Sequence, residues 1–138
     1  MKLKLVAYTP NIETMVATSM LTTTSGAQPS TLYKRLLANP EKVKKIVERV
    51  EVQHGNILEH NRVIWELEAS SEEVLEVILN SKFFNFTKLE NSRWIVSSNL
   101  RSVAEYSQNN SGVFIDMIIE SIRETTPQIY GFIMEGAR

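Results

Sequence analysis

The sequence of 138 residues contains no cysteine, so disulfides, thiolate nucleophiles and cysteine-bound zinc or iron–sulfur centres are excluded. Glycine and proline are scarce, at five and four residues, which argues against long disordered linkers. The formal net charge is −1, without a basic block, so we expect no nucleic-acid partner. No apolar run reaches the ~20 residues that a membrane span needs. We therefore expect a cytoplasmic protein without membrane contact.

The patterns that are present alternate between strand and helix. Apolar and aromatic residues predict strands near residues 2–8, 62–69, 83–89 and 93–98. Three- and four-residue spacings predict helices, of which one begins after Asn39 and another after Ser70, with Val74, Leu75, Ile78 and Leu79 as the apolar residues of the second. Residues 22–30 are rich in threonine and serine and predict a loop. The order of elements predicts an α+β fold in a single domain over residues 1–138.

The segment 54–60, which reads H-G-N-I-L-E-H, carries both histidines of the chain. Histidine has an unperturbed pKa near neutrality and donates hydrogen bonds to anions, so this concentration indicates a site. The six-residue separation of His54 and His60 does not suit two metal ligands on one helix, which prefer a spacing of three or four. We therefore expect no metal site. The alternative reading, that a histidine only fastens a turn, explains one of the two more easily than both.

A second candidate lies at residues 99–102, where a predicted helix follows directly on a predicted strand. Arg101 could present its guanidinium to a phosphate or carboxylate, beside the N–H groups of the helix start. An ordinary Asn99 cap with a solvated arginine explains the same residues, and the sequence alone favours it. No G-x-S-x-G, P-loop or G-x-G-x-x-G motif is present. We assign no catalytic residue and no substrate-binding residue.

Taken together, these segments resemble the flavin-dependent thymidylate synthase (ThyX) family. The resemblance rests on the H-G-x-x-L-E-H turn at 54–60, on the N-x-R-S motif at 99–102, and on the strand and helix that begin the chain. It covers most of the chain, which is a short, divergent member by this reading. It implies a mixed fold with a small antiparallel sheet, FAD as the cofactor, dUMP as the methylated nucleotide, and a homotetramer. By position, His54, Asn56, Asn99 and Arg101 would bind the flavin, and Glu59 and His60 would hold the turn.

The sequence departs from the family at its signature, R-H-R-x-x-S. Where the family places these arginines, after the helix that follows the second strand, this chain reads S-K-F-F-N-F-T-K at 81–88. Phenylalanine cannot bind a phosphate, and a lone lysine lacks the bidentate geometry of arginine. The loss of several charge-assisted contacts, at ~1.5–3 kcal/mol each, weakens the binding of anionic ligands by orders of magnitude.

Three functional hypotheses follow. The first is a catalytically degenerate ThyX-like protein, a homo-oligomer with residual flavin or nucleotide binding. The second is an active but divergent flavoenzyme, in which Lys82, Arg93 and Arg101 contact an anionic ligand. The third is a non-catalytic interaction or regulatory partner, in which residues 83–86 form an apolar contact surface.

Overall fold

A computed structural model describes residues 1–50 and 52–136 of the chain, and for residues 52–55 the backbone only. The described residues form four strands, seven α-helices and one 3₁₀ helix. The strands are β1 (Lys2–Tyr8), β2 (Val63–Glu68), β3 (Asn85–Lys88) and β4 (Arg93–Ser98). The helices are α1 (Ile12–Thr22), α2 (Pro29–Leu37), α3 (Pro40–Val47), the 3₁₀ helix η1 (Val52–Glu59), α4 (Ser71–Asn80), α5 (Leu100–Asn109), α6 (Val113–Ser121) and α7 (Pro127–Gly136). This α+β composition confirms the fold class predicted from the sequence.

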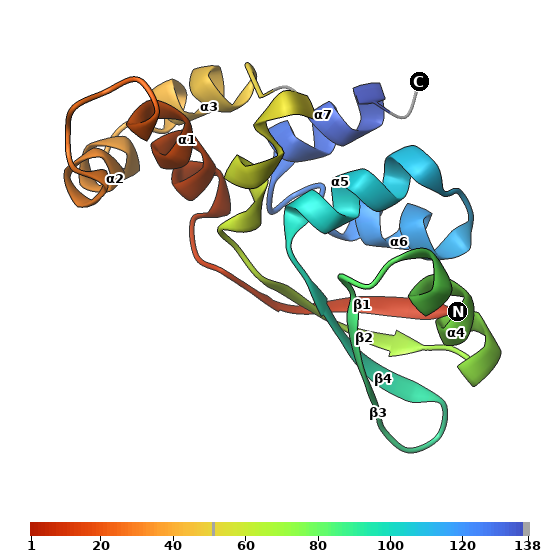
Figure 1. The fold of residues 1–138 in the computed structure, drawn as a ribbon. Helices are drawn as coiled ribbons and strands as arrows, with labels where there is room; N and C mark the ends of the chain where they lie inside the picture. Colours follow the sequence, from red (N-terminus) through yellow and green to blue (C-terminus); the bar gives the residue numbers. More distant parts are fainter. Residues whose placement is uncertain (51, 137–138) are drawn as a thin grey trace.

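The four strands form one antiparallel sheet in the order β1-β2-β4-β3. Trp65 of β2 pairs with Leu5 of β1 and with Val96 of β4, which in turn pairs with Phe86 of β3. Residues directly opposite each other point to the same face, so this row forms part of the apolar face of the sheet. Helices α5 and α6 lie along this face, and α1, α2 and α3 gather beyond one end of the sheet (Figure 1).

Two buried tryptophans and an aromatic cluster fill the space between the sheet and the helices. The indole nitrogen of Trp65 donates to Ser121 Oγ at 2.7 Å, and that of Trp94 donates to the carbonyl of Ala69 at 2.9 Å. A buried indole N–H needs such a partner. Phe84 meets the rings of Tyr106 and Phe114 edge-on, with centroid distances of 5.6 and 5.4 Å. These contacts join the start of the β3–β4 hairpin to α5 and α6.

The predicted helix caps at Asn39 and Ser70 are confirmed. Asn39 Oδ1 accepts the N–H of Lys42 at 3.2 Å. Ser70 Oγ accepts the N–H of Glu73 at 3.1 Å, while the Glu73 carboxylate accepts the N–H of Ser70 at 2.9 Å. The capping box therefore fixes the start of α4 directly after β2.

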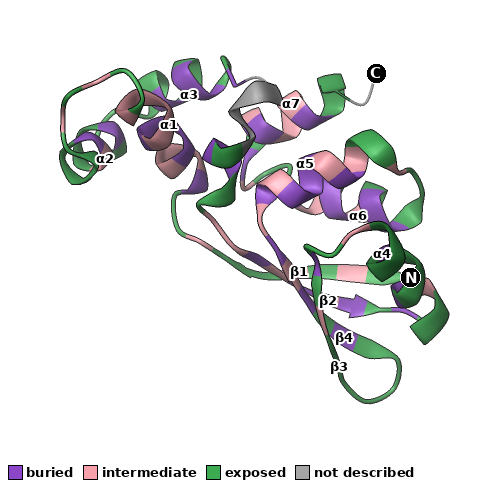
Figure 2. Cartoon of the chain, in the orientation of Figure 1, coloured by how far each residue is buried: buried purple, intermediate pink, exposed green. Residues whose placement is uncertain are grey.

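Local details differ from the prediction at three places. Residues 29 and 30, assigned to a loop, begin α2, because Pro29 suits the first position of a helix. Strand β3 begins at Asn85, and Phe84 before it is in the core. On α4, which was predicted as a helix, the buried residues are Val74 and Val77, whereas three of the four apolar residues that predicted it are exposed, namely Leu75, Ile78 and Leu79. Figure 2 shows most of α4 as exposed surface.

Candidate functional site

The histidine segment forms the end of η1 and the connection to β2. Ile57 and Leu58 are buried and anchor it in the core, whereas Asn56 and Glu59 are exposed. The side chain of His54 lies outside the described residues, so its assignment to a flavin site stays a prediction. Asn56 belongs to the element that packs on α5, although it does not line the hollow described below.

Asn61, which the sequence reading missed, fastens η1 to the start of α5. Its amide nitrogen donates to the carbonyl of Leu58 at 2.8 Å, and its Oδ1 accepts the N–H of Leu100 at 2.9 Å. One side chain therefore ends η1 and satisfies the first N–H group of α5. The only sequence signal was an asparagine directly after the H-G-x-x-L-E-H motif.

Asn99 is the N-cap of α5, as the simpler reading of residues 99–102 predicted. Its Oδ1 accepts the backbone N–H of Ser102 at 2.9 Å and the hydroxyl of Ser102 at 3.1 Å. Together with the Asn61 contact, this cap uses the N–H groups of Leu100 and Ser102. Two of the donors that an anion would need at this helix start are therefore already engaged.

Arg101 lies between two carboxylates. Its Nη1 contacts Glu59 of η1, and its Nε donates to Glu105 Oε1 at 2.9 Å. The hydrogen bonds to Glu59 and then to Glu105 raise the pKa of Arg101 above its already high ordinary value. The side chain remains 39% exposed, so water screens both ion pairs. Glu59 therefore links η1 to α5 by pairing with Arg101.

Asn99 and Arg101 meet at a surface hollow of about 270 Å³, which we call the Arg101 hollow. Its lining residues are Glu59, Phe83, Asn99, Arg101, Ser102 and Glu105. Two carboxylates and one guanidinium give the lining a formal charge of −1, which repels an anionic ligand. The two predicted residues are therefore brought together, but in a negatively charged and partly aromatic environment.

Phe83 is the second lining residue that the sequence reading did not place there. Its ring is 51% exposed, and Lys82 Nζ lies 5.3 Å from the ring centroid. Its carbonyl accepts from Ser98 Oγ at 3.4 Å, which keeps it near the end of β4. A phenylalanine of the segment that replaces the R-H-R signature thus lies in the same hollow as Asn99 and Arg101.

The three cations of the divergent-enzyme hypothesis do not converge. Arg93 begins β4, whereas Arg101 follows the end of that strand. Six strand residues separate their ends by about 20 Å. Arg93 Nη1 instead lies 3.9 Å from Glu66 Oε1. This arrangement leaves Arg93 outside the Arg101 hollow and weakens the second hypothesis.

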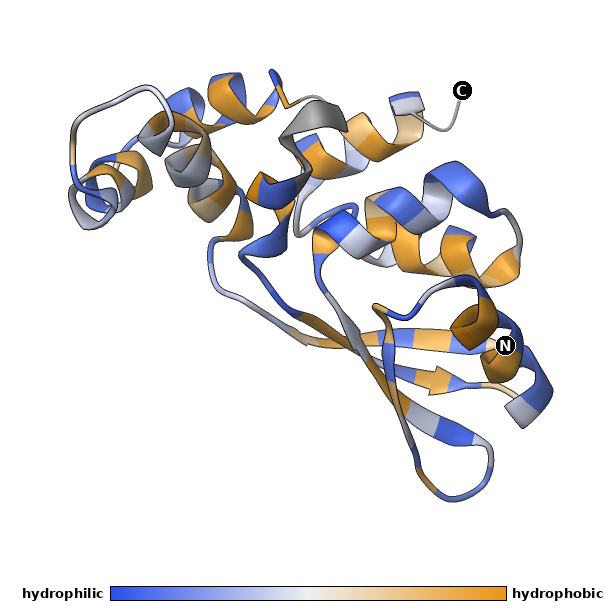
Figure 3. Cartoon of the chain, in the orientation of Figure 1, coloured by the Kyte–Doolittle hydropathy of each residue, from blue (hydrophilic) through white to orange (hydrophobic). Residues whose placement is uncertain are grey.

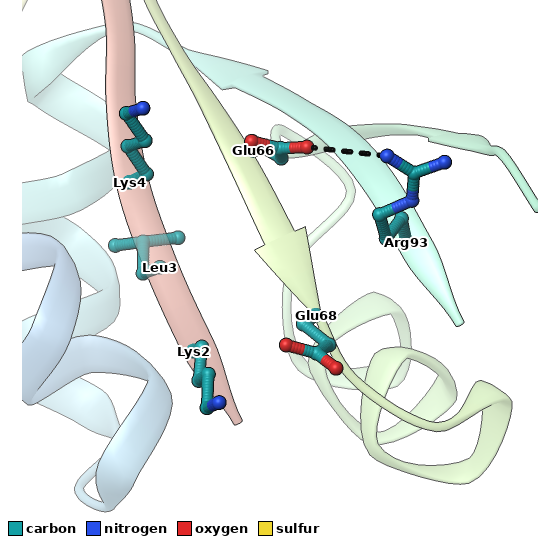
Figure 4. A pocket seen from close by; sticks show the side chains of 6 residues that line it. All are labelled: Lys2, Leu3, Lys4, Glu66, Glu68 and Arg93. Atoms are coloured by element: carbon teal, nitrogen blue, oxygen red, sulfur yellow. Dashed lines mark ion pairs between the residues drawn. The ribbon is translucent and has the colours of Figure 1, made fainter. Parts of the chain in front are cut away.

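Arg93 and Glu66 belong to a row of charges on the other face of the sheet (Figure 4). A shallow hollow of about 190 Å³ lies there, lined by Lys2, Leu3, Lys4, Glu66, Glu68 and Arg93. Cations on β1 and β4 flank the acidic residues of β2. Exposed ion pairs of this kind contribute little to stability, and the charges of the two partners neutralise each other.

A partly buried carboxylate lies where α1 meets α7. Glu13 of α1 accepts the N–H of Gln128 at 3.2 Å and so caps α7 from a distant part of the chain. Its second oxygen is buried without a hydrogen-bond partner among the described residues. Burial raises the pKa of Glu13 to about 7, against the lowering effect of its hydrogen bonds to backbone N–H groups of α7.

Among residues 1–50 and 56–136, whose side chains the structure describes, no cluster of three or more His, Asp or Glu side chains could hold a metal ion. None of the helices in the described part of the chain has both the length and the apolar character needed to cross a bilayer.

The sequence matches no protein-family model and no curated protein. Solved structures, by contrast, share its fold. A flavin-dependent thymidylate synthase ThyX from Helicobacter pylori, complexed with FAD and dUMP, superimposes with a TM-score of 0.64 at 11% identity, over 96% of this chain and 99% of that one. A second structure of Thymidylate Synthase X from Helicobacter pylori with FAD and dUMP gives a TM-score of 0.65 at 11% identity, over 100% of both chains. The chain therefore has the fold of the flavin-dependent thymidylate synthases along its whole length.

Proposed function

We propose that this protein is a catalytically degenerate ThyX-like protein, which binds a flavin ring weakly and does not methylate dUMP. The shared fold supports the relationship, since both similar structures contain FAD and dUMP. The observation that carries the proposal is the composition of the Arg101 hollow, where Phe83, Glu59 and Glu105 surround Asn99 and Arg101. We also expect self-association, because the family resemblance implies a homotetramer.

The hollow suits an uncharged planar ring better than a phosphate. The Phe83 ring and the Arg101 guanidinium are both flat surfaces on which an aromatic ring can stack. The amide nitrogen of Asn99 is not used by the helix cap and can donate to a ring oxygen or nitrogen. The two glutamates oppose a diphosphate, and the N–H groups of Leu100 and Ser102 are occupied.

Catalysis of dUMP methylation requires the nucleotide phosphate, the flavin and the carbon donor to be held in one geometry. The R-H-R signature that would supply the arginines is absent, and residues 81–88 carry phenylalanines and lysines instead. Charge-assisted contacts contribute ~1.5–3 kcal/mol each. Losing two or three of these contacts weakens the binding of the anionic ligands and slows dUMP methylation, and the combined loss amounts to several orders of magnitude.

Flavin titration tests the binding half of the proposal. We expect a shift of the flavin absorbance or fluorescence. The dissociation constants for riboflavin and FAD should agree within about threefold, because the diphosphate of FAD adds no binding free energy. Phe83→Ala should weaken both, whereas Leu37→Ala, which removes an exposed leucine from α2, should not. A protein without any spectral shift would contradict ring binding. Much tighter binding of FAD than of riboflavin would contradict the exclusion of phosphates.

An activity assay tests the other half. Purified protein with FAD, NADPH, methylenetetrahydrofolate and dUMP should form no dTMP above a control without protein. Robust turnover would refute degeneracy and favour the active, divergent enzyme. Because ring binding and turnover are measured separately, the failure of one half leaves the other standing.

A further inference from the structure

Helix α4 carries an apolar surface that no element described here covers. Leu75, Ile78 and Leu79 are 53%, 45% and 77% exposed, and their spacing of three and four residues places them on one side of the helix. Much of α4 is coloured hydrophobic in Figure 3 although Figure 2 shows it as exposed. The three side chains present on the order of 300 Å², comparable to the largest apolar patches of ordinary monomers. We call this surface the α4 stripe.

Two residues of the α4 stripe, Leu75 and Ile78, lie on the side of α4 that is turned toward β3. Ser71, Leu75 and Ile78 are separated by four and three residues and share one side of α4. Ser71 Oγ lies 3.3 Å from Lys88 Nζ of β3, which places this side of α4 toward β3. Because the strand order is β1-β2-β4-β3, the far side of β3 is an edge. An apolar helix side and a free strand edge thus lie together.

The pairing of β3 with β4 determines which backbone groups the edge offers. Leu89 N–H donates to the carbonyl of Arg93 at 2.8 Å, and Thr87 lies opposite Ile95 in the same register. Hydrogen-bonded and non-hydrogen-bonded pairs alternate along an antiparallel ladder. Residues 85, 87 and 89 therefore bond to β4, and the N–H and C=O groups of Phe86 and Lys88 point outward.

We propose that a second copy of this chain pairs with this edge, antiparallel to β3 about a two-fold axis at Thr87, so that the two α4 stripes bury each other. About that axis Phe86 of one copy lies opposite Lys88 of the other. These are the two residues whose backbone groups point outward, so each such pair exchanges two hydrogen bonds. The symmetry also places both α4 helices on the same side of the joined sheet.

The side chains are compatible with this arrangement. Phe86 and Lys88 point to the helix side, like their partners Val96 and Trp94, and a lysine then faces a phenylalanine rather than another lysine. Thr87, at the axis, is small. A short edge strand that carries lysine is protected against promiscuous pairing. Strand β3 has only four residues, which limits the area of the contact between the two copies. We therefore expect this contact by itself to be weak, with a dissociation constant on the order of 10–100 μM for an interface at the low end of specific sizes.

The proposal names the surface of the expected self-association and is independent of flavin binding, so either can fail alone. Sedimentation equilibrium between about 10 and 500 μM brackets the expected constant. Leu79→Glu alters an exposed residue of the stripe. Lys88→Pro removes one outward N–H and leaves the bonds between β3 and β4, because proline is tolerated on a free edge. Leu37→Glu on α2 is the matched control for the first variant, and Lys88→Ala, which keeps the N–H, is the control for the second.

We expect concentration-dependent association of the wild type, at least tenfold weaker (about 1.4 kcal/mol) in Leu79→Glu and Lys88→Pro and nearly unchanged in the controls. Circular dichroism of each variant checks that it is folded, and Leu79→Glu alone suffices if the proline disturbs β3. A wild type that stays monomeric throughout would overturn the proposal and leave this surface to a different partner. So would association that neither Leu79→Glu nor Lys88→Pro weakens beyond its control.

Discussion

Replacing Glu13 by glutamine tests how the core tolerates a charge at the contact between α1 and α7. Burial raises the pKa of Glu13 to about 7 in the folded protein, from an ordinary value of 4.5. Between these pH values the folded state holds the proton and the unfolded chain releases it. The folded state therefore binds more protons, and the free energy of unfolding falls as the pH rises. The stabilisation is fully present below about pH 4.5 and is lost through about pH 7.

The magnitude follows from the separation of the two pKa values. At about 1.4 kcal/mol per pH unit, the interval from 4.5 to about 7 corresponds to at most about 3.5 kcal/mol. The side chain is only partly buried, so screening by water reduces the effect to about 1–2 kcal/mol. Glutamine keeps the oxygen that accepts from Gln128 and cannot ionise. Any destabilisation that the glutamine amide itself causes is the same at every pH, so it does not change how the free energy of unfolding depends on pH.

Urea unfolding at several pH values between 4.5 and 8 measures the effect. The free energy of unfolding of Glu13→Gln minus that of the wild type should increase by about 1–2 kcal/mol over this range. Taking this difference cancels Glu73, whose pKa the backbone and hydroxyl of Ser70 lower, with the opposite dependence on pH. Glu41→Gln, at the exposed first turn of α3, is the matched control for replacing a carboxylate by an amide without burial. A difference that falls with pH would refute the reasoning, because attraction between the carboxylate and the start of α7 would then exceed the cost of burial.

Three further substitutions test the packing and the caps. Ser70→Ala removes one half of the capping box of α4 and should lower the free energy of unfolding in urea by about 1 kcal/mol. Phe84→Ala opens a cavity beside Tyr106 and should cost about 3–5 kcal/mol, seen as a large drop in Tm. Asn61→Ala leaves the N–H of Leu100 without its acceptor, which should cost about 1–3 kcal/mol and speed hydrogen exchange at the start of α5.

The elements that the sequence predicted well are those whose signals are local. The alternation in residues 2–8 and 62–69 marks strands because side chains of a strand alternate between its faces. The Asn39 cap and the Ser70 capping box were predicted because a cap and its acceptor lie within three residues. The α+β class followed from the order of such elements.

The sequence was less informative where several local patterns compete. Residues 29 and 30 follow a polar segment, and α2 has only two buried apolar residues, Leu32 and Leu36, so its helical pattern is weak. On α4, Val74 with Val77 and Leu75 with Leu79 are two apolar pairs at helical spacing. Periodicity detects that the segment is a helix, but only the packing of the chain decides which pair is inward.

In the Arg101 hollow, too, residues that are neighbours in the sequence were predicted, whereas residues from distant segments were not. Asn99 and Arg101 were predicted together because they are neighbours in the N-x-R-S motif. Phe83, Asn61 and Glu59 come from other segments, and their contacts with the start of α5 depend on how β2, β3 and η1 are arranged. The replacement of the arginine signature was visible in the sequence, whereas the position of Phe83 in this hollow was not.

The two contacts of Arg101 set a physical limit on what this hollow can bind. A phosphate there must either share the guanidinium with Glu59 and Glu105 or displace them, and it approaches two negative charges in doing so. Displacement would also release the link between η1 and α5, so that anion binding and local packing compete for one side chain. An uncharged ring meets no such competition, because it stacks on the flat guanidinium while both ion pairs stay formed. The arginine of the N-x-R-S motif is thus present in the sequence, but its charge is paired with Glu59 and Glu105 within the chain.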